Sequence, residues 1–266
     1  EELIHKFLRP LSPNAFIATK LGRFPEPGNS ENYTFENFRR FTENSLKRLN
    51  IDSLDLTQLH CIPTKLIESG EVFDWLRTLK QEGKIKQFGA SVESISEAQI
   101  CLKQEGLASL QIIFNIFRQK PIIDLFEQAK TKEVSLIVRL PLASGLLGGQ
   151  LNSKTSFPEN DHRLFNSDGQ CFNVGETFAG IPFNAGLNLV EELKKLLPEG
   201  MNLAQMALRW ILDFDAVTVV IPGSKSPHQI PENASASNLP TLPKPLHEKI
   251  NLFYKEKIAQ HIRGKY

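Results

Sequence analysis

The chain has 266 residues, with 31 lysines and arginines against 30 aspartates and glutamates, so its formal net charge is +1. This balance excludes a strongly basic chain of the kind that binds nucleic acid or an anionic membrane, and no apolar run is long enough to span a bilayer. The three cysteines form no close pair, which favours a reducing, cytoplasmic setting over a disulfide framework. The first residues lack the pattern of a signal peptide.

Short apolar runs predict six strands. In chain order they are Phe16–Lys20, Leu54–His60, Ile85–Ser91, Leu110–Phe114, Ser135–Leu140 and Val217–Ile221. Most are continuous rather than alternating, as expected for strands covered on both faces of a parallel sheet. Helical periodicity lies between them and predicts helices over Thr34–Leu49, Ile67–Gln81, Ser94–Gln104 and Asn202–Phe214. Alternating strands and helices indicate right-handed βαβ crossovers.

This α/β pattern fits an open doubly wound sheet or a closed (β/α)8 TIM barrel. No G-x-G-x-x-G follows the first strand, which weighs against the dinucleotide fold of the open type. We therefore expect a barrel with six of its eight βα units in residues 1–266, which form one domain. The chain starts as if within a helix, so we expect the first two units to lie ahead of Glu1.

One connection is unusually long. It covers residues 152–183, after the strand that would be the seventh of the barrel. Loops of this length are usually functional or disordered. Five phenylalanines predict that it packs against the domain, and a decorated surface insertion is the alternative: Phe157, Phe165, Phe172, Phe178 and Phe183.

Two of the predicted strands end in a titratable residue. Lys20 closes the first and His60 closes the second. A solvated lysine and a satisfied core histidine are the ordinary interpretations of such residues, but carboxyl ends of barrel strands converge on the active site. A lysine that lowers a neighbour's pKa and a histidine that donates to a developing oxyanion suit carbonyl reduction. No second histidine or carboxylate cluster accompanies His60, so we expect no metal site.

A second candidate site follows the last predicted strand. Gly223, Ser224 and Lys225 form a turn before a short helix. Backbone N–H groups at a helix start, a hydroxyl and an ammonium can hold a phosphate, and barrels often bind phosphate after their last strands. The alternative is a plain turn with an exposed lysine.

Five motifs, in the same order along the chain, resemble those of the aldo-keto reductases. They are Ala18-Thr19-Lys20, Asp55 to His60, Gly89-Ala90-Ser91, Ser144 to Leu147, and Ile221-Pro222-Gly223 with Gln229, Glu232 and Asn233. The resemblance covers essentially the whole chain. It implies a (β/α)8 barrel that binds NADPH without a Rossmann motif, and a catalytic set of Asp, Tyr, Lys and His in which Tyr donates the proton.

The resemblance also implies roles for individual residues. Lys20 and His60 match the family's Lys and His, while the Asp and Tyr would lie ahead of Glu1, because Tyr33 belongs to the loop after Lys20. The remaining matches are cofactor contacts: Ser91, Gln111 and Arg139 at the nicotinamide, Leu142, Ser144, Gly145 and Leu147 at the pyrophosphate, Gly223, Ser224 and Lys225 at the 2′-phosphate, and Gln229, Glu232 and Asn233 at the adenine.

Two positions depart from the family pattern. Val92 replaces the usual Asn, and Arg139 stands where many members have a Tyr stacked on the nicotinamide. A planar guanidinium can still cover a ring.

The hypothesis from the sequence is an NADPH-dependent reductase of a small-molecule aldehyde or ketone. An NADPH-binding regulatory subunit of weak activity is the alternative that Val92 and Arg139 keep open. A phosphate-binding barrel lyase or isomerase would explain the turn at Gly223 but not the pairing of Lys20 with His60. The sequence names neither the substrate nor the oligomeric state.

Overall fold

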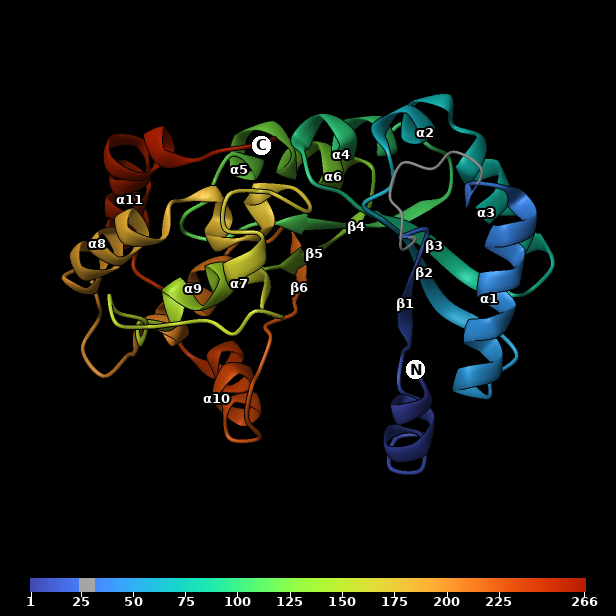
Figure 1. The fold of residues 1–266 in the computed structure, drawn as a ribbon, viewed down its shortest axis with the longest axis horizontal. Helices are drawn as coiled ribbons and strands as arrows, with labels where there is room; N and C mark the ends of the chain where they lie inside the picture. The colour runs from blue at the N-terminus through green and yellow to red at the C-terminus, as the bar shows by residue number, and fades with distance from the viewer. Residues whose placement is uncertain (24–31) are drawn as a thin grey trace. The chain divides into compact units, whose positions relative to one another are not determined.

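The computed structural model describes residues 1–23 and 32–266. These residues group into two compact units. The first comprises Glu1–Val92, Ser96–Gln111 and Gln128–Ser135, and the second Glu93–Ile95, Ile112–Glu127 and Leu136–Tyr266. Each unit combines parallel strands with helices, as Figure 1 shows.

The first unit contains a parallel sheet. Its strands, hydrogen-bonded in this order, are β1 (Ala18–Leu21), β2 (Leu54–His60), β3 (Ile85–Ser91) and most of β4 (Leu107–Ile113). The four strands predicted here are confirmed, and β2 and β3 match residue for residue. β1 begins two residues after the predicted Phe16, and β4 begins three residues before the predicted Leu110.

Helices cover this sheet. α1 (Phe35–Leu49) begins where Thr34 Oγ1 accepts a hydrogen bond of 3.2 Å from the Asn37 N–H, and it packs against β1. The predicted single helix over Ile67–Gln81 is wrong: α2 (Thr64–Ser69) and α3 (Glu71–Gln81) are separated by Gly70, whose φ of 77° breaks the helical path. α4 (Ile95–Cys101) is shorter than the predicted Ser94–Gln104.

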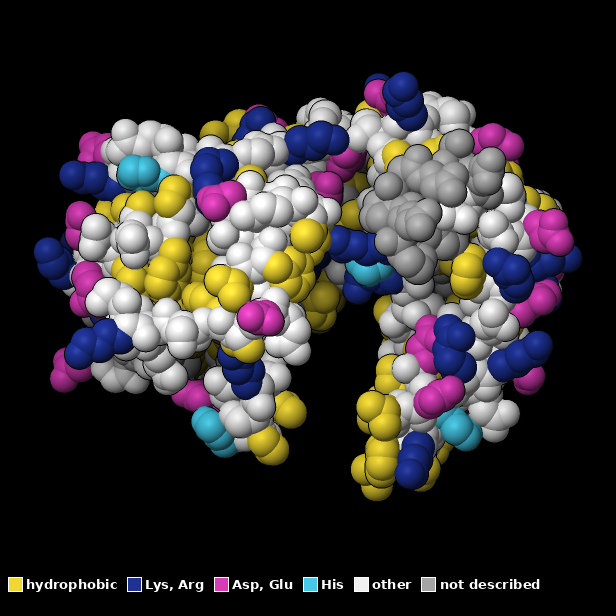
Figure 2. All heavy atoms as spheres, in the orientation of Figure 1, with side chains coloured by type: hydrophobic (Ala, Val, Ile, Leu, Met, Phe, Trp, Pro, Cys, Tyr) yellow, Lys and Arg dark blue, Asp and Glu magenta, His cyan; other side chains and the backbone are white. Residues whose placement is uncertain are grey.

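The N-terminal segment of the first unit is apolar yet exposed. A π-helical turn covers Ile4–Leu8, and the exposed side chains include Leu3, Phe7 and Leu11. Figure 2 shows hydrophobic side chains gathered at this end of the chain. They therefore add little to the core of the unit. No helix in residues 1–23 or 32–266 is long and apolar enough to cross a membrane.

In the second unit β5 (Ser135–Arg139) pairs in parallel with β6 (Val217–Val220), with Ile137 opposite Val219. Both predicted strands are confirmed. The predicted helix Asn202–Phe214 is confirmed as α9 (Leu203–Leu212), which opens with a capping box between Asn202 and Gln205. The short helix expected after Lys225 is α10 (Gln229–Ser235). The sequence patterns did not predict the other helices of this unit: α5 (Pro121–Asp124), α6 (Phe126–Thr131, shared with the first unit), α7 (His162–Phe165), α8 (Phe183–Lys194) and α11 (Lys244–Phe253).

Aromatic side chains form the core of the second unit and fix its long loop. Trp210 of α9 lies 5.0 Å from Phe114 and 5.0 Å from Phe214, centroid to centroid. In the loop 152–183, the ring of Phe178 lies 5.8 Å from that of Phe157 and 5.0 Å from that of Phe183. The loop packs down at Phe178, which is 2% exposed, whereas Phe165 is 39% exposed, so the predicted packing holds for only some of the five phenylalanines.

Candidate active site

Polar side chains lie along one face of the first unit's sheet, at the carboxyl ends of its strands. His60 of β2 is in register with Ser91 of β3, and Ser91 with Gln111 of β4. Lys20 of β1 is in register with Gln58, two residues before His60. Residues two apart on a strand project to the same face, and paired residues of parallel strands do so as well. Lys20 and His60 therefore share one edge and one face of the sheet, as predicted.

Exposure differs along this face. Lys20 is exposed and His60 is half-buried, whereas Ser91 and Gln111 are 1% and 3% exposed. The backbone bonds continue beyond the strands, because the N–H of Cys61 donates to Ser91 O at 3.0 Å and the N–H of Val92 donates to Gln111 O at 3.0 Å. The face thus combines an exposed ammonium and an imidazole with buried polar groups, an arrangement suited to proton movement beside a bound ring.

Two buried residues on this face, Gln58 and Ser109, were not among the predicted site residues. Gln111 Nε2 donates to Gln58 Oε1 at 3.0 Å, and Gln58 Nε2 donates to Ser109 Oγ at 3.2 Å. Gln58 lies within the Asp55–His60 motif, two residues before His60. Because residues two apart on a strand project to the same face, this spacing could have predicted that Gln58 lies on the face of His60. Its partners on β4 could not be read from the sequence, because they lie more than fifty residues further along the chain.

Asp55, in the same motif, holds the start of the sheet together. Its carboxylate accepts hydrogen bonds from the Ile17 N–H at 2.9 Å and from Lys86 Nζ at 2.7 Å. Burial by itself would raise the pKa of Asp55, but these donors lower the pKa below its ordinary value. Asp55 therefore ties β1 and β3 to β2 at the amino end, away from Lys20 and His60.

In the second unit Arg139 ends β5 and forms an ion pair with Glu176 of the long loop. Arg139 Nη1 lies 3.1 Å from Glu176 Oε1, and both side chains are 12% exposed. The sequence predicted that Arg139 would cover the nicotinamide. Its guanidinium is oriented by a carboxylate that the sequence analysis did not identify, and a planar guanidinium so held can still present a face to a ring.

The predicted pyrophosphate residues form a tight turn after β5. Ser144 and Gly145 adopt φ values of 54° and 100°, and the N–H groups of Gly145 and Leu147 donate to Leu142 O at 2.9 and 3.1 Å. Leu147 is fully buried and anchors the turn. The Ser144 hydroxyl donates to Glu176 O at 3.2 Å and accepts from the Phe178 N–H at 3.0 Å, so it fastens the long loop to this turn.

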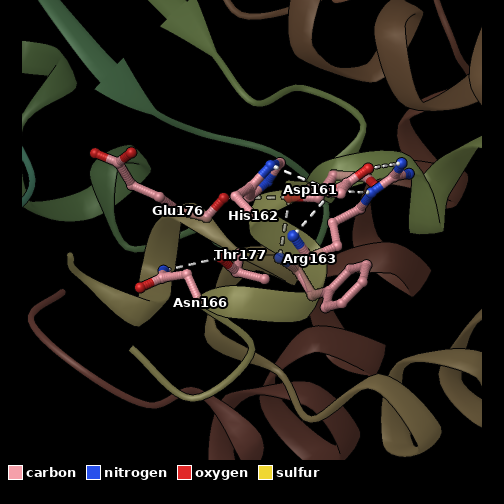
Figure 3. A network of polar contacts seen from close by, with 8 residues as sticks. Asp161, His162, Arg163, Asn166, Glu176 and Thr177 are labelled. Carbon is pink, nitrogen blue, oxygen red and sulfur yellow. Dashed lines mark hydrogen bonds and ion pairs between the residues drawn. The ribbon is translucent and has the colours of Figure 1, made fainter. Parts of the chain in front are cut away.

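A polar network orders the loop itself (Figure 3). Arg163 Nε and Nη2 donate to the two oxygens of Asp161 at 2.9 and 2.6 Å, and its guanidinium lies 4.3 Å from the Phe157 ring centroid. The Arg163 hydrogen bonds hold the pKa of Asp161 far below its ordinary value. Burial lowers the pKa of the neighbouring His162, which favours the neutral imidazole.

The far end of the loop is held by the C-terminal residues. Arg263 Nη1 lies 2.6 Å from Asp168 Oδ1, and Arg263 Nε donates to Gly180 O at 3.0 Å. Arg118 is buried beneath, where it donates to the carbonyls of Ala179 and Lys265. Burial lowers the pKa of Arg118 to about 10, which still leaves it charged at neutral pH. The second half of the loop is therefore fastened within the second unit, both to the turn after β5 and to the C-terminal residues.

The predicted phosphate and adenine residues also come together in the second unit. The N–H groups of Lys225 and Ser226 both donate to Gln229 Oε1, at 2.7 and 3.3 Å, and Asn233 Nδ2 donates to Ser224 Oγ at 3.2 Å. Glu232 lies apart from this set and accepts from Asn202 Nδ2 at 3.0 Å. The turn is thus preformed and Lys225 is exposed.

The groups of each unit, taken separately, suit one part of the cofactor that the motifs imply. A Cβ placed on Gly223 meets no described atom within 4 Å, and the ammonium of Lys225 is available to an anion beside it. In the first unit Ser91 and Gln111 offer a hydroxyl and an amide in a nearly dry environment, where a hydrogen bond to a carboxamide is strong. The nicotinamide positions and the 2′-phosphate positions are therefore chemically consistent with the cofactor that the motifs imply.

A family model described as the aldo/keto reductase family matches residues 1–254. The chain belongs to this family. It is 30% identical over 248 residues to the aldo-keto reductase Str7 of Strobilurus tenacellus, covering 90% of this chain and 69% of that protein. It is 27% identical over 233 residues to the aldo-keto reductase Yakc [NADP(+)] of Schizosaccharomyces pombe, covering 83% of this chain and 64% of that protein.

Among solved structures, the glycerol dehydrogenase AKR11B4 from Gluconobacter oxydans matches with a TM-score of 0.74 and 25% identity, covering 100% of this chain and 80% of that one. The fold class predicted from the sequence is confirmed. The chain has the α/β architecture of the family's (β/α)8 barrels, and the described residues contain six of the strands.

Proposed function

We propose that the protein reduces an aldehyde or ketone to an alcohol with NADPH as the reductant. The observation that carries the proposal is the shared face of the first unit's sheet, on which Lys20 and His60 lie beside the buried groups of Ser91 and Gln111. NADPH, when bound, would supply a hydride to the carbonyl carbon. The residues of this chain would bind it, orient the carbonyl and tune the proton donor.

Each of the two titratable residues has a distinct role in this proposal. The Lys20 ammonium would lower the pKa of a neighbouring phenol, because a positive charge stabilises the phenolate. The His60 imidazole would donate a hydrogen bond to the carbonyl oxygen and stabilise the charge that develops there. In this family the phenol belongs to a Tyr accompanied by an Asp. The motif matches assign neither to a residue of this sequence, so the proposal concerns a protein that includes both.

The preference for NADPH follows from the second unit. Lys225 is exposed in a preformed turn with Ser224, where its ammonium can pair with a 2′-phosphate. The name of the Schizosaccharomyces pombe relative includes NADP(+), which supports the same cofactor. We place the reaction in the cytoplasm, because the three cysteines are free thiols.

Single-turnover hydride transfer tests the proposal. The protein, with the proton-donating Tyr present, is mixed with NADPH and a reactive aromatic aldehyde, and loss of the NADPH absorbance is followed. We expect transfer in the parent and a loss of several decades in Lys20→Met, which keeps the side-chain length but removes the charge. NADPH affinity should be similar in both. A parent that binds NADPH tightly and transfers no hydride would instead support an NADPH-binding regulatory role.

A further inference from the structure

A hydrogen-bonded relay crosses the sheet of the first unit behind its polar edge. It runs from Gln111 Nε2 to Gln58 Oε1 at 3.0 Å, and from Gln58 Nε2 to Ser109 Oγ at 3.2 Å. The three side chains are 3%, 1% and 2% exposed in that order. Gln58 therefore uses its acceptor for Gln111 and a donor for Ser109, and both partners lie on β4.

This relay bridges two strands that are not neighbours. β3 lies between β2 and β4, and in register Gln58 faces Gly89, which faces Ser109. A Cβ placed on Gly89 would lie 2.2 Å from Ser109 Oγ and 2.5 Å from Ser109 O. The absence of a side chain at Gly89 leaves the space through which Gln58 reaches β4.

The direction of the relay fixes which end of the Gln111 amide is available. Because one N–H of Gln111 Nε2 donates to Gln58, the acceptor that Gln111 keeps for a ligand is its carbonyl oxygen Oε1. A glutamine without this partner could turn its amide by half a rotation at little cost. Gln58 restricts that freedom, because a flip of the Gln111 amide alone would place two carbonyl oxygens against each other in a nearly dry site. The two amides can flip only together, with the Ser109 hydroxyl then donating to Gln58.

We propose that Gln58 is a positioning residue for the nicotinamide ring, acting through Gln111. It holds Gln111 so that Oε1 accepts from the amino group of the nicotinamide carboxamide, which fixes the rotation of the ring and thus the face that meets the substrate. This inference rests on the proposed function, since it requires a nicotinamide cofactor at Gln111.

The test compares Gln58→Leu with the parent in binding and in stereochemistry, with the full protein. Titration calorimetry with reduced nicotinamide mononucleotide should show affinity weakened by about tenfold, the scale of one hydrogen bond. Adenosine 2′,5′-bisphosphate, which lacks the nicotinamide, should bind both proteins equally. Transfer from NADPH deuterated at one C4 position should become less stereospecific in Gln58→Leu, a readout that a purely structural role would not change.

A double-mutant cycle isolates the path through Gln111. In a Gln111→Leu background, Gln58→Leu should have little further effect on mononucleotide affinity. Thr57→Val is the matched control, since Thr57 is equally buried next to Gln58 but projects to the other face, and it should leave binding unchanged. If Gln58→Leu does not fold, Ser109→Ala, which removes only the relay's last acceptor, should weaken the mononucleotide by about twofold to fivefold.

Four outcomes would overturn the inference. Equal losses for the mononucleotide and the bisphosphate, or additive effects in the cycle, would make Gln58 a core residue without a directed role. Unchanged binding and stereospecificity in Gln58→Leu, with the parent binding NADPH, would refute the inference alone. A parent that binds no NADPH would refute the proposed function, and this inference with it.

Discussion

Gly89→Ala should destabilise the protein far more than an alanine at an open glycine such as Gly148. The added Cβ would lie 2.2 Å from Ser109 Oγ and 2.5 Å from Ser109 O, and the second atom belongs to the backbone of the paired strand β4. A side-chain oxygen can rotate away, but the backbone carbonyl can move only if the strand moves. Gly89 is therefore required by close approach between two strands.

Three contributions set the expected change in the free energy of unfolding of Gly89→Ala. Overpacking of a well-packed site costs about 1–3 kcal/mol, and displacement of Ser109 leaves the buried Gln58 amide short of a partner, which costs about 1–3 kcal/mol. Reduced freedom of the unfolded chain returns roughly 0.4–1 kcal/mol. The net loss in the free energy of unfolding is about 3 kcal/mol, which corresponds to a melting temperature lower by roughly 6–12 °C.

Thermal unfolding followed by circular dichroism measures this effect. Gly148→Ala is the control, because a Cβ there meets no described atom within 4 Å and its φ is not positive. It should change stability by no more than about 1 kcal/mol. Adding Ser109→Gly to Gly89→Ala removes the contact with Oγ but not the contact with the backbone O, so it should recover only part of the loss. The reasoning is refuted if Gly89→Ala melts at the temperature of Gly148→Ala.

Three further predictions concern the candidate site and its loop. Lys225→Ala should weaken NADPH by about one to two decades, the scale of one charge-assisted contact, and leave NADH nearly unchanged in fluorescence-quenching titrations; equal losses would mean that Lys225 does not contact the 2′-phosphate. His60→Ala should lower single-turnover hydride transfer by about 10²–10³, as for loss of one oxyanion donor, and a rate equal to the parent's would make His60 a bystander. Arg163 lowers the pKa of Asp161 in the folded state. The ion pair therefore stabilises the protein fully at pH values above about 3.9, the pKa of Asp161 in the unfolded chain, and this stabilisation is lost as the pH falls towards the pKa of Asp161 in the folded protein. Asp161→Asn should therefore lower the free energy of unfolding at pH 7, measured by urea titration, and make that free energy depend less on pH below about pH 4. Asp168→Asn, which removes an exposed ion pair, should change this pH dependence less. An unchanged pH dependence in Asp161→Asn would show that the pair with Arg163 contributes nothing.

The strands could be predicted because their signal is local. A run of apolar residues covered on both faces needs no knowledge of its partner, and β2 and β3 were predicted with both ends correct. The errors arose where local character misleads. Phe16 is apolar but 65% exposed, so β1 begins later, and Ser109 is polar but buried, so β4 begins earlier than its apolar run suggested. Gly70 interrupts what the periodicity presented as one helix, because apolar spacing continues across it.

The sequence by itself predicted that Lys20, His60 and Ser91 close their strands, since the position of a residue in its strand is a local property. It placed Gln111 near the start of a strand, and only the earlier start of β4 at Leu107 puts Gln111 towards the carboxyl end. Only the tertiary structure decided what these and other residues contact. The relay through Gln58 and Gly89, the ion pair of Arg139 with Glu176 and the use of Ser144 to fasten the long loop each join segments more than thirty residues apart. Such pairings depend on the register of neighbouring strands and on the packing of the loop, which no periodicity along the chain encodes.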